Sequence, residues 1–125
     1  MARQYAQIVG IVLLLLGVAG LLLGDGILAS ALNIDLTEDL VHLVIGALFV
    51  YLGFAKVDNA TVKTVVGAVG AVLILVGIIG FISPTGFGLV PSGWTVIDNI
   101  IHLLLGLLGV AVGFLLDRDT TVTVR

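Results

Sequence analysis

Residues 6–23 read AQIVGIVLLLLGVAGLLL and contain no charged side chain. A helix rises 1.5 Å per residue, so a run of about this length crosses the roughly 30 Å hydrocarbon core of a bilayer. Lipid offers no hydrogen bonds to the backbone, and the run lacks the alternating pattern of a barrel strand, so a helix is predicted. Comparable apolar runs follow at Leu40–Ala55, Val62–Ile82 and Ile97–Leu116.

The whole composition agrees with a membrane location. Of the 125 residues, 60% are hydrophobic and only 10% are charged, whereas soluble domains carry roughly a quarter charged residues. The sequence therefore predicts an all-α membrane protein, a single membrane domain over residues 1–125. We expect transmembrane helices at about 5–23, 37–55, 62–82 and 96–116.

The basic residues predict the orientation, because Lys and Arg are retained on the cytoplasmic side during insertion. The loops at 24–38 and 83–95 contain none of them. We expect an inner-membrane protein with both termini in the cytoplasm. The five basic residues at the ends and in the middle loop are Arg3, Lys56, Lys63, Arg118 and Arg125.

The chain overlays on itself when it is shifted by sixty residues. The segment 38–43, EDLVHL, then aligns with 98–103, DNIIHL, and Gly20 aligns with Gly80. This pattern predicts two tandem direct repeats of a helical hairpin, at about 3–60 and 63–120. Repeats with an even number of crossings face the same way, which argues against the inverted-repeat mechanism of many transporters.

Glycines recur at seven-residue intervals on all four predicted helices. This spacing keeps one narrow helix face small, so neighbouring backbones can approach closely in lipid. We predict helix packing at Gly10, Gly17, Gly46, Gly53, Gly70, Gly77, Gly106 and Gly113, with Gly24 continuing the first series.

The two histidines occupy equivalent positions near the start of the second helix of each repeat. Glu38 precedes His42 by four residues and Asp98 precedes His102 by four, so each acid and imidazole share a helical face. One interpretation is cofactor binding, with His42 and His102 ligating a haem or a chlorophyll and with Gly46 and Gly106 leaving space beside the rings. The other, which we favour, is that each histidine is a polar interfacial residue bonded to its acid or to a neighbouring helix.

The acids before the histidines also suit helix capping. Asp35 lies three residues before Glu38, and Thr95 lies three residues before Asp98. This spacing is typical of a capping box, in which the capping side chain and the acid each bond the other's backbone N–H. We therefore expect helix capping at Asp35, Glu38, Thr95 and Asp98.

Several functions are disfavoured by what the predicted spans lack. No charged or amide side chain occurs in 8–23, 43–50, 65–82 or 103–116, so an ion or solute path within one molecule has nothing to line it. No nucleophile and base are spaced as a catalytic set, and we expect no enzyme and no metal site. Without cysteines there are no thiolate ligands, and a net charge of −3 argues against nucleic acid.

The stretch Asp98–Gly106, DNIIHLLLG, and the preceding loop Gly86–Pro91, GFGLVP, resemble a bacterial four-helix membrane family catalogued as domain of unknown function 4383. The likeness covers most of the chain, although the first half has Asp39 where the second has Asn99. The resemblance implies a four-helix membrane fold and no established activity.

Taken together, the sequence favours a small structural or assembly protein of the membrane. We expect it to associate through its glycine-rich helix faces, either with itself as a homo-oligomer or as a subunit of a larger membrane complex. The alternative is a tetrapyrrole-binding protein that uses His42 and His102.

Overall fold

The computed structural model describes residues 1–24, 26–28, 32–34, 36–90 and 93–116. Four helices within this part are long and apolar enough to cross a membrane, so the prediction of a multi-pass, all-α membrane fold is confirmed. In chain order the elements are α1 (Ala2–Leu23), β1 (Gly26–Leu28), β2 (Leu32–Ile34), α2 (Leu36–Phe54), α3 (Asn59–Ile82), α4 (Val96–Val110) and a π-helical turn, η1 (Ala111–Leu115).

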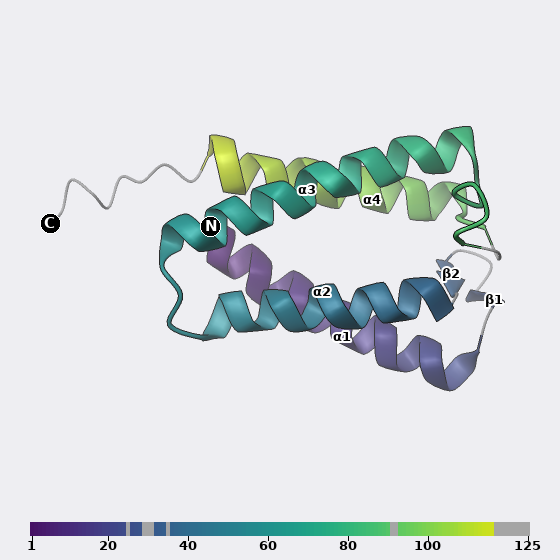
Figure 1. The fold of residues 1–125 in the computed structure, drawn as a ribbon, viewed down its shortest axis with the longest axis horizontal. Coiled ribbons are helices and arrows are strands. Elements are labelled where there is room, and N and C mark those ends of the chain that lie inside the picture. Colours follow the sequence, from purple (N-terminus) through teal and green to yellow (C-terminus); the bar gives the residue numbers. More distant parts are fainter. Residues whose placement is uncertain (25, 29–31, 35, 91–92, 117–125) are drawn as a thin grey trace, which may run out of the picture.

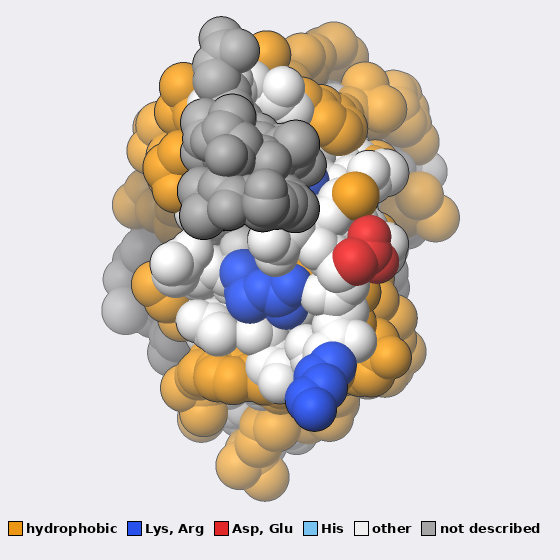
Figure 2. All heavy atoms as spheres, turned by 90° about the vertical axis from the view of Figure 1, so that its left-hand side faces the viewer, with side chains coloured by type: hydrophobic (Ala, Val, Ile, Leu, Met, Phe, Trp, Pro, Cys, Tyr) orange, Lys and Arg blue, Asp and Glu red, His pale blue; other side chains and the backbone are white. Residues whose placement is uncertain are grey.

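The helices pack as two hairpins, α1 with α2 and α3 with α4 (Figure 1). The hairpins meet mainly along α1 and α3. One end of the molecule carries Arg3 near the start of α1, Lys56 between α2 and α3, and Lys63 near the start of α3, and we call it the basic end. Lys and Arg side chains are visible on this face (Figure 2). The opposite end carries the buried acids Glu38, Asp39 and Asp98, and we call it the acidic end.

The helix boundaries differ from the predicted ones by a few residues. Helix α3 begins at Asn59, three residues before the expected start, because Asp58 caps it by accepting hydrogen bonds from the Thr61 N–H at 3.3 Å and hydroxyl at 2.7 Å. At the end of α4 the chain continues as η1, where the Leu116 N–H donates to the Ala111 carbonyl at 2.6 Å. Together α4 and η1 cover most of the predicted span 96–116.

A short β-hairpin lies in the loop between α1 and α2, where no strand is predicted. Strands β1 and β2 are antiparallel, with Gly26 opposite Ile34 and Leu28 opposite Leu32. Each strand has three residues, too few to change the fold class. Gly24 ends α1 with φ of 82°, and no atom of the described residues lies within 4 Å of the position of an added Cβ. The expectation that Gly24 continues the packing series is therefore wrong.

The buried apolar core is small and lies between the hairpins, while the outer faces are apolar and exposed. Phe49, Val62 and Val66 are fully buried, whereas Leu15 is 66% exposed and Leu22 is 81% exposed. This distribution is expected for a protein in lipid, because exposing a leucine side chain to hydrocarbon carries no free-energy penalty. The core residues are Ala2, Ala6, Val9, Phe49, Leu52, Val62 and Val66.

Candidate functional site at the acidic end

Close glycine contacts within each hairpin position α2 and α4, the helices that carry the histidines. A Cβ added to Gly10 would lie 2.8 Å from the Val50 backbone nitrogen, and one added to Gly70 would lie 2.7 Å from that of Val110. Such distances leave no room for a side chain, so the paired backbones are in contact. Gly46, Gly53, Gly106 and Gly113 likewise lie against the opposite backbone, whereas Gly17 and Gly77 lie against the side chains of Leu43 and Leu103. All six of these glycines are buried.

Two further glycines allow the helices of each hairpin to pack closely at the acidic end. The Asp39 carboxylate packs on Gly20, and the Asn99 carboxamide packs on Gly80, so close that a methyl group at either glycine would overlap the side-chain oxygen. Asp39 is 3% exposed and Asn99 is 2% exposed. A shift of sixty residues aligns Gly20 with Gly80 and Asp39 with Asn99, but the sequence does not by itself reveal these contacts. The matched positions are the signal from which the contacts could have been predicted.

A hydrogen bond joins the two hairpins at this end. The Trp94 indole N–H donates to Glu38 Oε1 at 2.6 Å, and Glu38 is only 8% exposed. This distance is short for an N–H···O hydrogen bond, so the two side chains are in close contact. Glu38 therefore contributes to the contact between hairpins, a role that sequence analysis does not predict for it.

The expected capping box of α4 is present. The Asp98 N–H donates to Thr95 Oγ1 at 3.0 Å, and the Thr95 N–H donates to Asp98 Oδ2 at 2.8 Å. This geometry satisfies two backbone donors at the helix start and fixes the direction in which α4 leaves the loop. Asp35, the expected cap of α2, lies outside the described residues.

The two histidines are half-buried and lie near one another. The His102 ring stands edge-on to Trp94, with centroids 5.9 Å apart and an interplanar angle of 84°. His42 lies within range of an electrostatic interaction with His102 and Asp98. His102 Nδ1 is buried and has no hydrogen-bond partner among the described residues. The structure thus brings together both histidines, Trp94 and Asp98.

The glycines expected to leave space beside the imidazoles do not do so. A Cβ at Gly46 would lie 2.9 Å from the Leu14 backbone nitrogen, and one at Gly106 would lie 2.7 Å from that of Ile74. The opposite helix of each hairpin fills this space, so that part of the cofactor interpretation is wrong. Across the described ranges, no three His, Asp or Glu side chains are grouped so that they could hold a metal ion.

The arrangement is best suited to holding helices together through buried hydrogen bonds and one edge-on aromatic pair. No protein-family model, curated protein or solved structure matches this chain, so the resemblance to the family of unknown function remains a prediction.

Proposed function

We propose that this chain is a small structural or assembly protein of the inner membrane. The proposal rests on one observation: polar side chains of this chain form hydrogen bonds between its helices and between its hairpins. Tyr5 donates to the Leu105 carbonyl at 2.7 Å, Gln7 donates to the Gly53 carbonyl at 2.8 Å, and Trp94 donates to Glu38. Such bonds stabilise a bundle and leave the outer faces free for lateral contacts.

We propose that the association surface lies on the outward apolar faces, and not on the glycine-rich faces that the sequence predicts. The packing glycines already contact helices of the same chain, so they cannot also contact a neighbour. The large side chains that point outward remain available. One exposed representative on each helix is Leu15, Val44, Leu75 and Leu104, which are 66%, 67%, 56% and 57% exposed.

Cysteine crosslinking tests this proposal cleanly, because the chain has no cysteine of its own. Leu15→Cys, Val44→Cys, Leu75→Cys and Leu104→Cys are expressed singly and oxidised in native membranes. We expect a covalent homodimer, or an adduct with a fixed partner, at one or two of these faces and none for Val66→Cys, which is fully buried. Only monomers at all four positions would contradict the proposal.

We further propose that both termini face the cytoplasm and that the chain is two copies of one hairpin. The first part is supported by Arg3, Lys56 and Lys63, which share one end. The second is supported by contacts that recur at an offset of sixty residues: Leu43 packs on Gly17 as Leu103 packs on Gly77, and the Asp39 and Asn99 contacts correspond likewise.

Tetrapyrrole binding remains the second candidate, and one observation favours it: His102 Nδ1 is buried without a partner near a second histidine. A haem or chlorophyll beside Gly46 or Gly106 would need space that the opposite helix of the same hairpin fills, so binding there would require the two helices of a hairpin to separate. The test is the absorption spectrum of protein purified from cells that make the cofactor. A visible band that is lost in the His42→Ala/His102→Ala variant would support binding, and the absence of a band would exclude it.

A further inference from the structure

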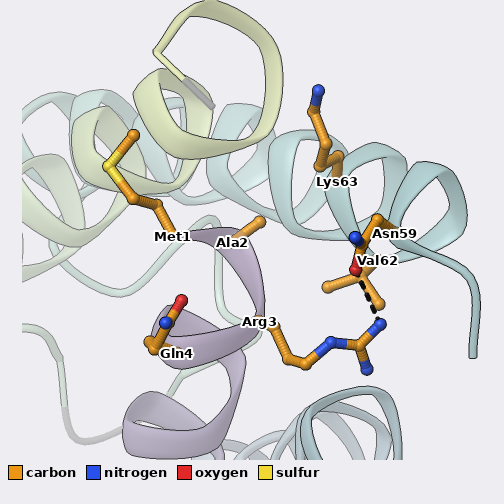
Figure 3. A pocket seen from close by; sticks show the side chains of 7 residues that line it. All are labelled: Met1, Ala2, Arg3, Gln4, Asn59, Val62 and Lys63. Atoms are coloured by element: carbon orange, nitrogen blue, oxygen red, sulfur yellow. Dashed lines mark hydrogen bonds between the residues drawn. The ribbon is translucent and has the colours of Figure 1, made fainter. Parts of the chain in front are cut away.

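A cavity of about 240 Å³ lies at the basic end, between the first turns of α1 and α3 (Figure 3). None of the contacts that hold the hairpins together at the acidic end involves it. A space of this size accommodates a group of several non-hydrogen atoms. Its described lining is Met1, Ala2, Arg3, Gln4, Asn59, Val62 and Lys63.

Of the described lining residues, two carry cationic side chains and none is acidic. Arg3 is held in place by neutral acceptors: its terminal nitrogens donate to Asn59 Oδ1 at 2.8 Å and to the carbonyls of Leu52, Ala55 and Val57. These bonds leave the guanidinium charged, and Asp58 is close enough to interact with that charge. The Asn59 carboxamide gives its oxygen to Arg3, which leaves its NH₂ group as a donor. Lys63 stands one turn further along α3 (Figure 3).

Among the described residues, the acid at this end is Asp58, and it does not line the cavity. Asp58 caps α3, and its carboxylate accepts from the Thr61 N–H and hydroxyl. The first turns of α1 and α3 contain no acidic residue, and backbone N–H groups there add partial positive charge. The cavity is therefore a cationic site with hydrogen-bond donors around it.

The position of the cavity along the helices indicates which class of ligand can reach it. Lys63 lies four residues into a helix that crosses the membrane, about 6 Å along its axis, so its ammonium extends to the level of the lipid headgroups. Basic pockets between transmembrane helices at this level are suited to anionic headgroups. We propose that the cavity binds the phosphate group of an anionic phospholipid, with Arg3 and Lys63 as the cations and Asn59 and Gln4 as amide donors.

A zwitterionic phospholipid is bound less well, because its choline brings a positive charge next to Arg3 and Lys63. This assignment is independent of the structural role proposed above.

Lys63 is the residue to substitute in a test, because Arg3 also holds the α2–α3 connection in place through the Leu52 and Val57 carbonyls.

The experiment is native mass spectrometry of the full chain in detergent, titrated with phosphatidylglycerol or phosphatidylcholine. We expect the wild type to prefer phosphatidylglycerol and Lys63→Gln to weaken its binding about fivefold, as loss of one interfacial cation predicts. Lys56→Gln is the matched control, because Lys56 is exposed at the same end but does not line the cavity. It should bind as the wild type does, and circular dichroism verifies that each variant is folded.

Three results would overturn the assignment. Equal binding of the two lipids would show that charge is not recognised. An equal loss of phosphatidylglycerol affinity in Lys56→Gln and Lys63→Gln would show that the lipid is attracted by the overall positive charge of this end and not by the cavity. If inorganic phosphate binds alone and displaces the lipid at equal concentration, the phosphate comes from solution and the lipid assignment is wrong.

Discussion

At the scale of single residues, Gly80 determines how closely α3 and α4 approach at the acidic end. The Asn99 carboxamide occupies the space where a β-carbon of residue 80 would be. In Gly80→Ala the added methyl forces Asn99 out of its position, and overpacking of this kind costs about 1–3 kcal/mol. The measurement is thermal unfolding in detergent, followed by circular dichroism.

Val72→Ala is the control for this variant, because Val72 points outward from the same helix and is 57% exposed. We expect a change within about 0.5 kcal/mol for it. A Gly80→Ala protein as stable as the control would contradict the close contact.

The Trp94–Glu38 hydrogen bond is the second residue-scale feature to test. Trp94→Phe keeps an aromatic ring beside His102 but removes the N–H donor, leaving a buried Glu38 oxygen without this partner. We expect a loss of about 1–3 kcal/mol, measured by the same unfolding assay. In a double-mutant cycle with Glu38→Gln, strictly additive effects would show that the two residues do not interact.

The sequence predicts some of these residues and not others for a simple reason. Thr95 and Asp98 are three residues apart, so their capping contact is local and follows from spacing alone. Trp94 and Glu38 are 56 residues apart and meet only because of how the hairpins are placed. No periodicity within a helix contains that information.

At the scale of elements, the start of α3 depends on Asp58. The hydrogen bond from the Thr61 hydroxyl, followed by that from its backbone N–H, lowers the pKa of Asp58 below its ordinary value of 3.8. A carboxyl with a depressed folded-state pKa stabilises the protein at pH values above the unfolded-state pKa, and this contribution disappears as the pH falls through the folded-state value.

We therefore expect the stability difference between wild type and Asp58→Asn to narrow between pH 6 and pH 3. The measurement is unfolding in detergent across this range. Thr61→Val, which removes the hydroxyl donor, should lessen the pH dependence of that difference. A constant difference at all pH values would exclude the ionised cap.

The elements that the sequence does not predict are the short and irregular ones. Strands β1 and β2 have three residues each, too few for an alternating pattern to emerge. The turn η1 needs one extra residue within a helical ladder, and its sequence, AVGFL, resembles the helical residues before it. The long helices are predicted because about twenty apolar residues have a single stable backbone solution in lipid.

At the scale of the whole molecule, the proposed orientation gives a direct prediction. Lys56 lies in the connection between α2 and α3, and Phe87, which is 77% exposed, lies in the opposite loop. In intact cells without the outer membrane, a maleimide that cannot cross the bilayer should label Phe87→Cys at once. Lys56→Cys should react only after permeabilisation, and the reverse pattern would invert the topology.

The number of crossings follows from the sequence, but the docking of the two hairpins does not. Tyr5 shows why: its ring meets Phe49 edge-on in its own hairpin, while its hydroxyl donates to the Leu105 carbonyl of the other. Gly109 admits the hydroxyl, because a Cβ there would lie 3.1 Å from it. Such contacts depend on the full three-dimensional arrangement.

The burial of Asp39 against Gly20 has a consequence for biogenesis. A lone α2 would carry this carboxylate into the bilayer without cover, an unfavourable state for any helix leaving the translocon. Because α1 is synthesised first, Gly20 is available when α2 emerges, and the two helices should partition into lipid as a closed pair. The second pair has the neutral Asn99 at the matching site, so no carboxylate has to be covered at that position when α4 emerges.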